Sequence, residues 1–228
     1  MLREVVVHPT SQALFEGAAQ RFLALASASL ERQGRFRVAL AGGSTPKGLY
    51  SCLAGAAFPW ERIDWFWGDE RMVPPEHPDS NFGMAFQALL SRVPVDHQRV
   101  HRVETERPDP AGRYETTLRD VFGEPCPRFD LILLGLGTDG HTASLFPGST
   151  ALDERDRLVA STLVPGLGER ITLTLPVLNH AASVMFLVSG REKREALRAV
   201  LHPEPRVPPR PAGLVTAPRL WMVDEAAI

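Results

Sequence analysis

Hydrophobic positions along the chain follow two spacings that alternate from one segment to the next. Leu14, Ala18 and Phe22 recur every three to four residues, which predicts a helix over residues 11–32 with one buried face. Short, largely apolar runs, such as residues 129–134 and 183–188, are typical of strands buried on both faces. Strand-like and helix-like segments therefore succeed one another along most of the chain.

The other segments can be assigned in the same way. Helices are expected at residues 11–32, 46–53, 81–90, 109–121 and 191–201. Strands are expected at residues 1–7, 36–41, 63–67, 129–134, 170–175 and 183–188, with short terminal strands at 214–215 and 220–223. This alternation predicts an α/β fold with a Rossmann-like, open, mostly parallel sheet and helices on both faces. We expect one domain over residues 1–228, with the proline-rich stretch 202–211 as a loop.

Local signals refine three of these elements. Ser44 or Thr45 is expected to cap the helix at 46–53, with Pro46 at its first position, and Asn81 can cap the helix at 81–90. Residues 170–175 alternate between polar and apolar, which predicts a half-exposed strand.

Composition narrows the classes of function. The 228 residues are 44% hydrophobic and 23% charged, with a formal net charge of -2, which is ordinary for a globular protein and argues against nucleic acid as the main partner. Cys52 and Cys126 lie far apart without metal-ligand spacing, so we expect reduced thiols and a cytoplasmic location. No apolar run reaches the roughly 18 residues of a membrane-spanning helix, so no membrane partner is expected.

Residues 135–147 (GLGTDGHTASLFP) carry the strongest chemical signal. Three glycines follow a predicted buried strand and let the backbone turn sharply beside a ligand. In open α/β sheets ligands bind at the carboxyl ends of the strands, which is where Asp139 and His141 are expected. Because a histidine moves a proton near neutral pH and an aspartate orients it, the pair predicts acid–base chemistry.

The same glycines match the dinucleotide-binding pattern G-x-G-x-x-G. That pattern requires a long helix directly after the loop, whereas Pro147 and Gly148 stop any helix within about two turns. Asp139 would also place a negative charge where a pyrophosphate binds. We therefore expect no nucleotide cofactor.

Residues 41–47 (AGGSTPK) join a predicted strand to a predicted helix and form a candidate phosphate site. Gly42, Gly43 and Ser44 would present backbone N–H groups at a helix N-terminus, where the helix dipole favours an anion. The segment lacks the Gly-Lys-Ser/Thr ending of a Walker A loop, and a tight turn with an ordinary cap explains it equally well. Pro46 replaces the last glycine of a G-x-S-x-G elbow, so a Ser44 nucleophile is not expected.

Further charged residues stand near predicted strand ends. The Arg71 guanidinium suits an anion or a developing oxyanion, and Asp69 suits a role in orienting a base or a substrate hydroxyl. Taken singly, Arg170 and Lys193 fit solvated surface positions better than binding roles. His77 has no second histidine or cysteine at ligand spacing, so no metal site is expected.

Taken in order, these segments resemble the glucosamine-6-phosphate isomerase/6-phosphogluconolactonase family, and its lactonases in particular. The matching segments are residues 41–46 (AGGSTP), 67–71 (WGDER), 79–81 (DSN), 135–148 (GLGTDGHTASLFPG), 170–174 (RITLT) and 189–193 (SGREK). The resemblance implies the open α/β fold of sugar-phosphate deaminases and ribose-5-phosphate isomerases. It implies hydrolysis of 6-phospho-D-glucono-1,5-lactone, the second step of the oxidative pentose phosphate pathway, with no required metal or other cofactor.

The resemblance also implies roles for individual residues. His141 resembles the general base that activates water, Asp139 its positioning partner, and Arg71 a group that stabilises charge at the reacting end. Phosphate-binding or site-lining roles are implied for Gly42, Gly43, Ser44, Asp69, Asn81, Arg170 and Lys193. A lactone is an activated ester, so water and a base suffice without a covalent intermediate.

Two alternatives share parts of this pattern. A sugar-phosphate deaminase/isomerase has a similar phosphate loop and Asp-Gly-His, but in deaminases of the family a glutamate follows, and residues 145–148 (LFPG) contain no carboxylate. A non-catalytic sugar-phosphate sensor would be expected to lose the base, and His141 is present. Four points stay open: the oligomeric state (monomer or small homo-oligomer), whether Asp139 or Asp69 supports His141, which basic residue meets the phosphate and which the reacting carbonyl, and whether other phosphorylated lactones are accepted.

Overall fold

The computed structural model describes residues 3–123 and 125–228, and its elements alternate as expected. The strands are β1 (Arg3–His8), β2 (Phe36–Leu40), β3 (Ile63–Trp67), β4 (Asp69–Arg71), β5 (Leu131–Leu134), β6 (Val159–Val164), β7 (Gly168–Leu173), β8 (Val184–Val188) and β9 (Arg219–Asp224). The helices are α1 (Ser11–Gln33), α2 (Ser44–Leu53), α3 (Asn81–Ala85), α4 (Pro110–Phe122), α5 (Leu175–His180) and α6 (Arg194–Leu201).

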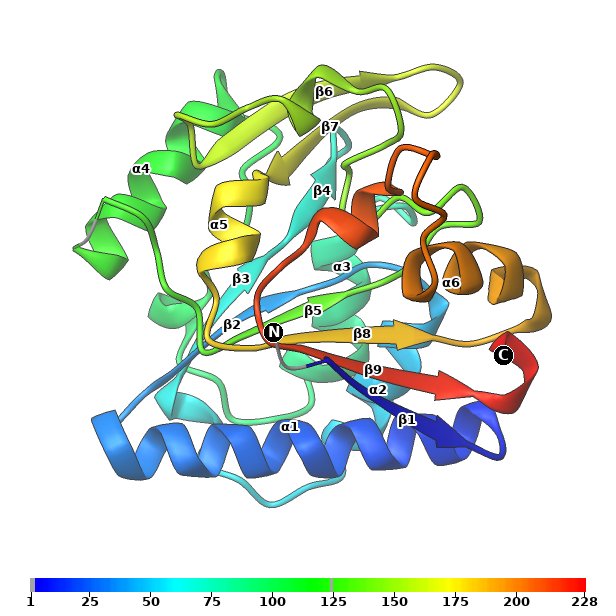
Figure 1. The fold of residues 1–228 in the computed structure, drawn as a ribbon. Coiled ribbons are helices and arrows are strands. Elements are labelled where there is room, and N and C mark those ends of the chain that lie inside the picture. Colours follow the sequence, from blue (N-terminus) through cyan, green and yellow to red (C-terminus); the bar gives the residue numbers. More distant parts are fainter. Residues whose placement is uncertain (1–2, 124) are drawn as a thin grey trace.

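A six-stranded sheet in the order β1-β9-β8-β5-β2-β3 runs through the middle of the molecule, and every neighbouring pair in it is parallel (Figure 1). Its side chains alternate between two cores. Leu131 and Leu133 of β5 pack with α1 and α2, whereas Ile132 and Leu134 pack with α4, α5 and α6. The predicted α/β fold with helices on both faces is confirmed.

A second, three-stranded antiparallel sheet in the order β4-β7-β6 was not predicted. Its strand β4 has only three residues, and β6 lies where no strand is predicted. The prediction of a half-exposed strand at 170–175 is wrong in part. Strand β7 ends at Leu173, and its last three residues are buried, with Ile171 and Leu173 in the core of the main sheet. The expected strand at 214–215 is wrong as well, because Pro211–Leu214 forms a 3₁₀ turn.

The starts of two helices also differ from the prediction. Helix α2 begins at Ser44 and is preceded by Gly43 with φ 100°, without any side-chain cap, so neither Ser44 nor Thr45 is the N-cap. Helix α3 is capped by Ser80, whose Oγ accepts a hydrogen bond from the Gly83 amide at 3.0 Å. Asn81 therefore keeps its side chain free for other contacts.

Two buried tyrosines hold the strand ends that lead to the predicted site residues. The Tyr50 hydroxyl of α2 accepts from the Ala41 amide (2.9 Å) and donates to the Ala41 carbonyl (2.8 Å), just after β2. The Tyr114 hydroxyl of α4 makes the same pair of bonds with Trp67 at the end of β3 (2.8 and 2.9 Å). Burial raises the pKa of both phenols, so both stay neutral and anchor the backbone where the ladder of the sheet ends.

Among the described residues, no helix combines the length and apolar character that crossing a membrane demands.

Candidate active site

A cleft of about 190 Å³ opens at the carboxyl edge of the main sheet, where the loops after β2, β3 and β5 meet the second sheet. The structure brings most of the predicted site residues to it; those that line the cleft are Gly42, Gly43, Asp69, Arg71, Asn81, His141, Arg170 and Lys193. Asp139 reaches the cleft through His141, which it contacts directly. Ser44 is exposed at the first residue of α2 and is not part of the lining.

His141 is paired with Asp139. Its Nδ1 lies 2.6 Å from Oδ1 of Asp139, and the same oxygen accepts the His141 backbone N–H at 3.0 Å. Burial alone would raise the pKa of Asp139, but the His141 amide and ring outweigh it and hold the pKa below its usual range. Since Nδ1 is occupied, Nε2 is the ring nitrogen left for a ligand or water in the cleft.

The imidazole ring is also confined on other sides. The Phe146 ring stacks on it with centroids 4.0 Å apart and planes 28° apart. Gly137 makes room for its edge, because a Cβ at that position would lie only 2.1 Å from Nδ1 of His141. A ring confined in this way needs little reordering when a substrate arrives.

Asp69 supports a different group. Its Oδ2 accepts from Ser144 Oγ at 2.6 Å, and its backbone carbonyl accepts from Asn81 Nδ2 at 2.9 Å. Ser144 belongs to the loop that carries His141, so this buried carboxylate joins that loop to the second sheet. The structure thus places Asp139, and not Asp69, against His141.

Asn81 leaves one buried atom without a partner in the described part of the chain, its side-chain Oδ1. The backbone of Gly42 approaches this atom so closely that a Cβ on residue 42 would lie 1.8 Å from it. A buried acceptor without a partner is costly, and a ligand hydroxyl in the cleft would satisfy it.

The Glu70 side chain holds both ends of the segment that runs from Arg71 to Asn81. Its buried carboxylate accepts the backbone N–H groups of Arg71 (2.8 Å), Asn81 (2.7 Å) and Phe82 (2.7 Å), and the Ser80 hydroxyl at 3.2 Å. Burial raises the pKa of Glu70, although these amide donors offset part of the effect. Glu70 therefore orients two of the predicted site residues through their backbones.

Arg71 and Arg170 lie directly opposite each other on the antiparallel pair β4 and β7. Burial and the neighbouring Arg71 charge lower the pKa of Arg170. The Nε atoms of both side chains are buried without a partner among the described residues, although an Arg71 Nη1 donates to the Asp79 carbonyl. Like charges directly opposite each other destabilise a sheet, so this pair is best suited to an anion that touches both groups.

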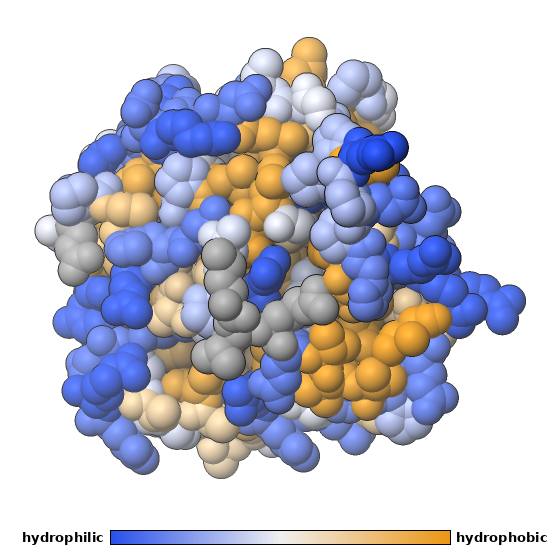
Figure 2. Space-filling model, viewed as in Figure 1, coloured by the Kyte–Doolittle hydropathy of each residue, from blue (hydrophilic) through white to orange (hydrophobic). Residues whose placement is uncertain are grey.

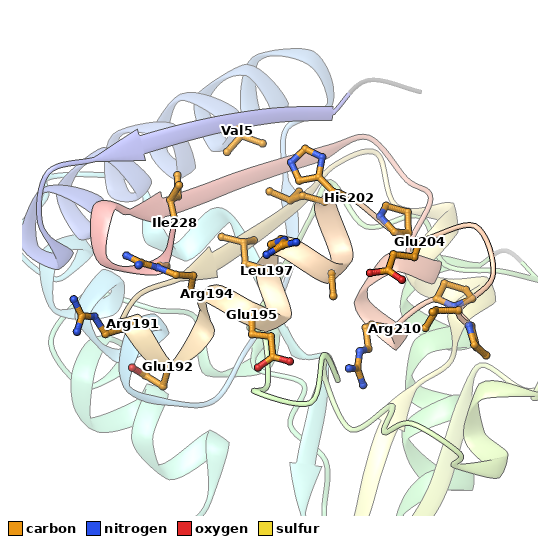
Figure 3. Close-up of a pocket in the computed structure, with 18 residues that line it drawn as sticks. Val5, Arg191, Glu192, Arg194, Glu195, Leu197, His202, Glu204, Arg210 and Ile228 are labelled. Carbon is orange, nitrogen blue, oxygen red and sulfur yellow. The ribbon is translucent and has the colours of Figure 1, made fainter.

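A second concavity, which we call the hollow, has about 1290 Å³ and lies between α6, the stretch after it and the C-terminal residues (Figure 3). Apolar side chains border it at Val5, Val207 and Ile228. Figure 2 shows a hydrophobic (orange) surface over β1. Its charged groups, of both signs, belong mostly to exposed residues of α6 and its flanks. None of the predicted site residues lines it.

Within residues 3–123 and 125–228, no three histidine, cysteine, aspartate or glutamate side chains gather closely enough to hold a metal ion.

Three residues that the sequence did not point to contact the predicted site residues. Phe146 and Ser144 lie inside the 135–148 segment but carry no acid–base signal of their own. Arg210, which reaches the Asp139 carbonyl at 3.3 Å, stands in a stretch expected only to be a loop.

Comparison with known proteins points to one family. The sequence profile described as glucosamine-6-phosphate isomerases/6-phosphogluconolactonase matches residues 9–223. A Nostoc protein named 6-phosphogluconolactonase is 42% identical over 235 residues, covering 100% of this chain and 98% of its own. The solved 6-phosphogluconolactonase of Trypanosoma cruzi is 30% identical, with a TM-score of 0.90 over 100% of this chain and 97% of its own. A solved monomeric glucosamine-6-phosphate deaminase, 20% identical with a TM-score of 0.82 over 98% of each chain, shares the fold.

Proposed function

Because the chain belongs to the glucosamine-6-phosphate isomerase/6-phosphogluconolactonase family, we propose that it hydrolyses 6-phospho-D-glucono-1,5-lactone to 6-phospho-D-gluconate, the second step of the oxidative pentose phosphate pathway. The observation that carries the proposal is the His141–Asp139 pair, which shares one cleft with two guanidinium groups whose Nε atoms have no partner among the described residues. The pair supplies a proton acceptor, and the guanidinium groups supply anion binding.

The proposed base is Nε2 of His141. It takes a proton from water while the water oxygen bonds to the lactone carbonyl carbon, and the carbonyl oxygen becomes an oxyanion. Collapse of that intermediate breaks the bond to the ring oxygen, which receives the proton back from the imidazolium. Asp139 orients the ring through Nδ1 and stabilises its charged form, as an ionised carboxylate does beside a histidine base.

The proposed binding groups divide between the two ends of the substrate. Arg170, Lys193 and the backbone of Gly42 and Gly43 hold the phosphate, with α2 supplying its N-terminal dipole. Arg71 stabilises charge near the reacting carbonyl. Remote binding of the phosphate fixes the ring and contributes to the reaction rate, not only to affinity.

Asp69 and Asn81 line the cleft between these ends. The unpartnered Oδ1 of Asn81 is proposed to accept a hydrogen bond from a ring hydroxyl of the lactone. Ser44 keeps only a peripheral place in the proposal, through its backbone at the start of α2, because its side chain is exposed and caps nothing.

We also propose a cellular location and the partners of the reaction. Neither Cys52 nor Cys126 forms a disulfide within the described residues, which agrees with a cytoplasmic enzyme. The reaction needs the phosphorylated lactone and water as partners, and a monomer or small homo-oligomer stays a prediction.

The experiment that tests the function compares two substrates. The lactone is generated in situ from glucose 6-phosphate, and its disappearance is measured against spontaneous ring opening, with ammonia release from glucosamine 6-phosphate measured in parallel. We expect accelerated lactone loss and no ammonia. Ammonia release without lactone loss would assign the deaminase reaction instead, and sugar-phosphate binding with neither activity would assign a sensor.

A specific observation disfavours the deaminase alternative. In the described part of the chain, the carboxylate that contacts His141 is Asp139, and residues 145–148 bring no second one. Phe146 occupies the adjoining face of the ring instead.

A further inference from the structure

Arg210 lies between the hollow and the proposed catalytic loop. It stands at the end of the proline-rich stretch after α6, directly before the 3₁₀ turn Pro211–Leu214. Figure 3 shows it at the border of the hollow, on the opposite side from Val5. Unlike most of its stretch, which is exposed, Arg210 is half-buried, and Pro211 and Ala212 after it are buried.

This segment makes three contacts with the turn that precedes His141. Arg210 Nη1 donates to the Asp139 carbonyl at 3.3 Å, and the Ala212 amide donates to the Gly140 carbonyl at 3.0 Å. The aliphatic part of Arg210 covers Gly140, where a Cβ would lie only 2.7 to 3.0 Å from Cβ, Cγ and Cδ of Arg210. Gly140 also has φ 84°, a conformation that side chains rarely adopt.

The turn is otherwise closed mainly on itself. The Gly137 amide donates to the His141 carbonyl and the Gly140 amide donates to the Gly137 carbonyl, both at 2.9 Å. Such short-range bonds fix the shape of the turn, but they do not fix its position on the rest of the molecule. Ser144 on Asp69 ties the loop to the second sheet further along the chain. Contacts from Arg210 and Ala212 add a constraint on the two residues between Thr138 and His141.

We propose that Arg210 is a positioning residue, which clamps the Asp139–Gly140 turn so that the Asp139 carboxylate and the His141 ring keep their mutual geometry in the cleft. The inference rests on the proposed role of His141 as the base. Arg210 does not line the cleft, so it acts through the turn and not on the substrate. Misplacing a catalytic group by a fraction of an ångström reduces the rate of the chemical step while leaving substrate binding intact.

The residue is well suited to a clean substitution. Among the described residues, no carboxylate lies within ion-pair distance of Arg210, so its removal strands no partner charge. Arg206 offers a matched control, because it is an exposed arginine of the same stretch. Arg206→Ala changes the same charge without touching the turn.

The kinetic test compares Arg210→Ala, Arg210→Lys and Arg206→Ala on the lactone. We expect Arg210→Ala to lower kcat about tenfold with KM within twofold of the unchanged protein. Lysine keeps the aliphatic cover and a cationic donor, so Arg210→Lys should recover most of kcat. Arg206→Ala should retain kcat and KM. An unchanged kcat in Arg210→Ala, or a loss confined to KM, would overturn the proposal.

A second measurement does not depend on activity. Amide hydrogen exchange of residues 137–142 is followed without substrate, and we expect faster exchange in Arg210→Ala than in Arg206→Ala, with the rest of the sheet unaffected. Equal exchange in the two variants would refute the clamp even if the lactone is hydrolysed. If the unchanged protein fails to hydrolyse the lactone, the proposed function fails, and the exchange data still decide whether Arg210 holds the turn.

Discussion

The cleft and the hollow differ in size, and the smaller one is the better candidate for chemistry. The hollow beside α6 has about 1290 Å³ and the cleft at the sheet edge about 190 Å³. Three residues of the cleft, Arg71, Asn81 and Arg170, hold buried polar atoms that lack partners, whereas no lining residue of the hollow in the described chain does. Unsatisfied buried groups cost free energy, so the three that converge on the cleft favour a polar ligand there.

The two concavities also differ in how their charges are supported. Charged residues of the hollow project from one helix and its flanks into solvent, where single charges contribute little. Charged residues of the cleft come from several strand ends, and two of them are oriented by carboxylates, Arg71 by Glu70 and His141 by Asp139. Convergence of supported charges is what a catalytic site requires.

The largest effect that would test this contrast is the loss of the proposed base. His141→Ala should lower kcat for lactone hydrolysis at least about a hundredfold, the lower end of what a general base contributes. His97→Ala, at an exposed histidine, is the matched control and should retain activity. Near-normal turnover in His141→Ala would remove His141 from the mechanism.

Loss of a phosphate-binding cation should act on binding. Arg170→Ala should raise KM by about tenfold to a hundredfold, because a charged hydrogen bond contributes about 1.5–3 kcal/mol. Its thermal midpoint should not fall, since the substitution also relieves the repulsion with Arg71. Arg92→Ala, at an exposed arginine, serves as the control. A defect in kcat alone would refute the phosphate role, and Lys193→Ala should behave similarly.

Asp139→Asn should lower kcat about tenfold or more, because the amide cannot stabilise the charged imidazole. The pKa of Asp139 is lowered by folding, so its carboxylate stays ionised and its contribution is lost only as pH falls below about 3.9, the ordinary aspartate value. Activity lost between pH 7 and 5 therefore does not come from Asp139.

In the same variant, the pH–rate profile should change, because the carboxylate that contacts the proposed base is gone. The exposed Asp156→Asn is the control and should leave the profile unchanged. An unaltered profile in Asp139→Asn would show that Asp139 does not act on the base.

The smallest effect is expected in the hollow. Arg198→Ala, on the exposed face of α6, should leave kcat and KM for the lactone within twofold of the unchanged protein. A loss of more than tenfold in kcat/KM would show that the hollow, and not the cleft alone, takes part in the reaction.

The sequence predicted what is encoded locally. The strand that leads into residues 135–148, the glycines of that loop and the pairing of residues two apart, Asp139 and His141, are all short-range features. The alternation of strands and helices was enough to predict the parallel sheet, because buried parallel strands have unbroken apolar runs. The predicted cap of α2, Ser44 or Thr45, is wrong because the position before the helix has a backbone φ of 100°, which glycine adopts readily.

What the sequence did not predict depends on residues that are distant in the chain. The opposition of Arg71 and Arg170 follows from the register of a second sheet whose strands are too short to be recognised. Ser144 on Asp69 and Arg210 on Asp139 join positions separated by 75 and 71 residues. No spacing rule reaches that far, so these contacts become visible only in three dimensions.

The juxtaposed guanidinium groups of Arg71 and Arg170 have a practical consequence for handling the protein. Any small oxyanion that enters the cleft relieves their repulsion, so phosphate or sulfate in a buffer should raise the thermal midpoint while competing with the substrate. Storage conditions chosen for stability would then hide activity. Assays belong in buffers whose anions are too large or too weakly coordinating to occupy the arginine pair.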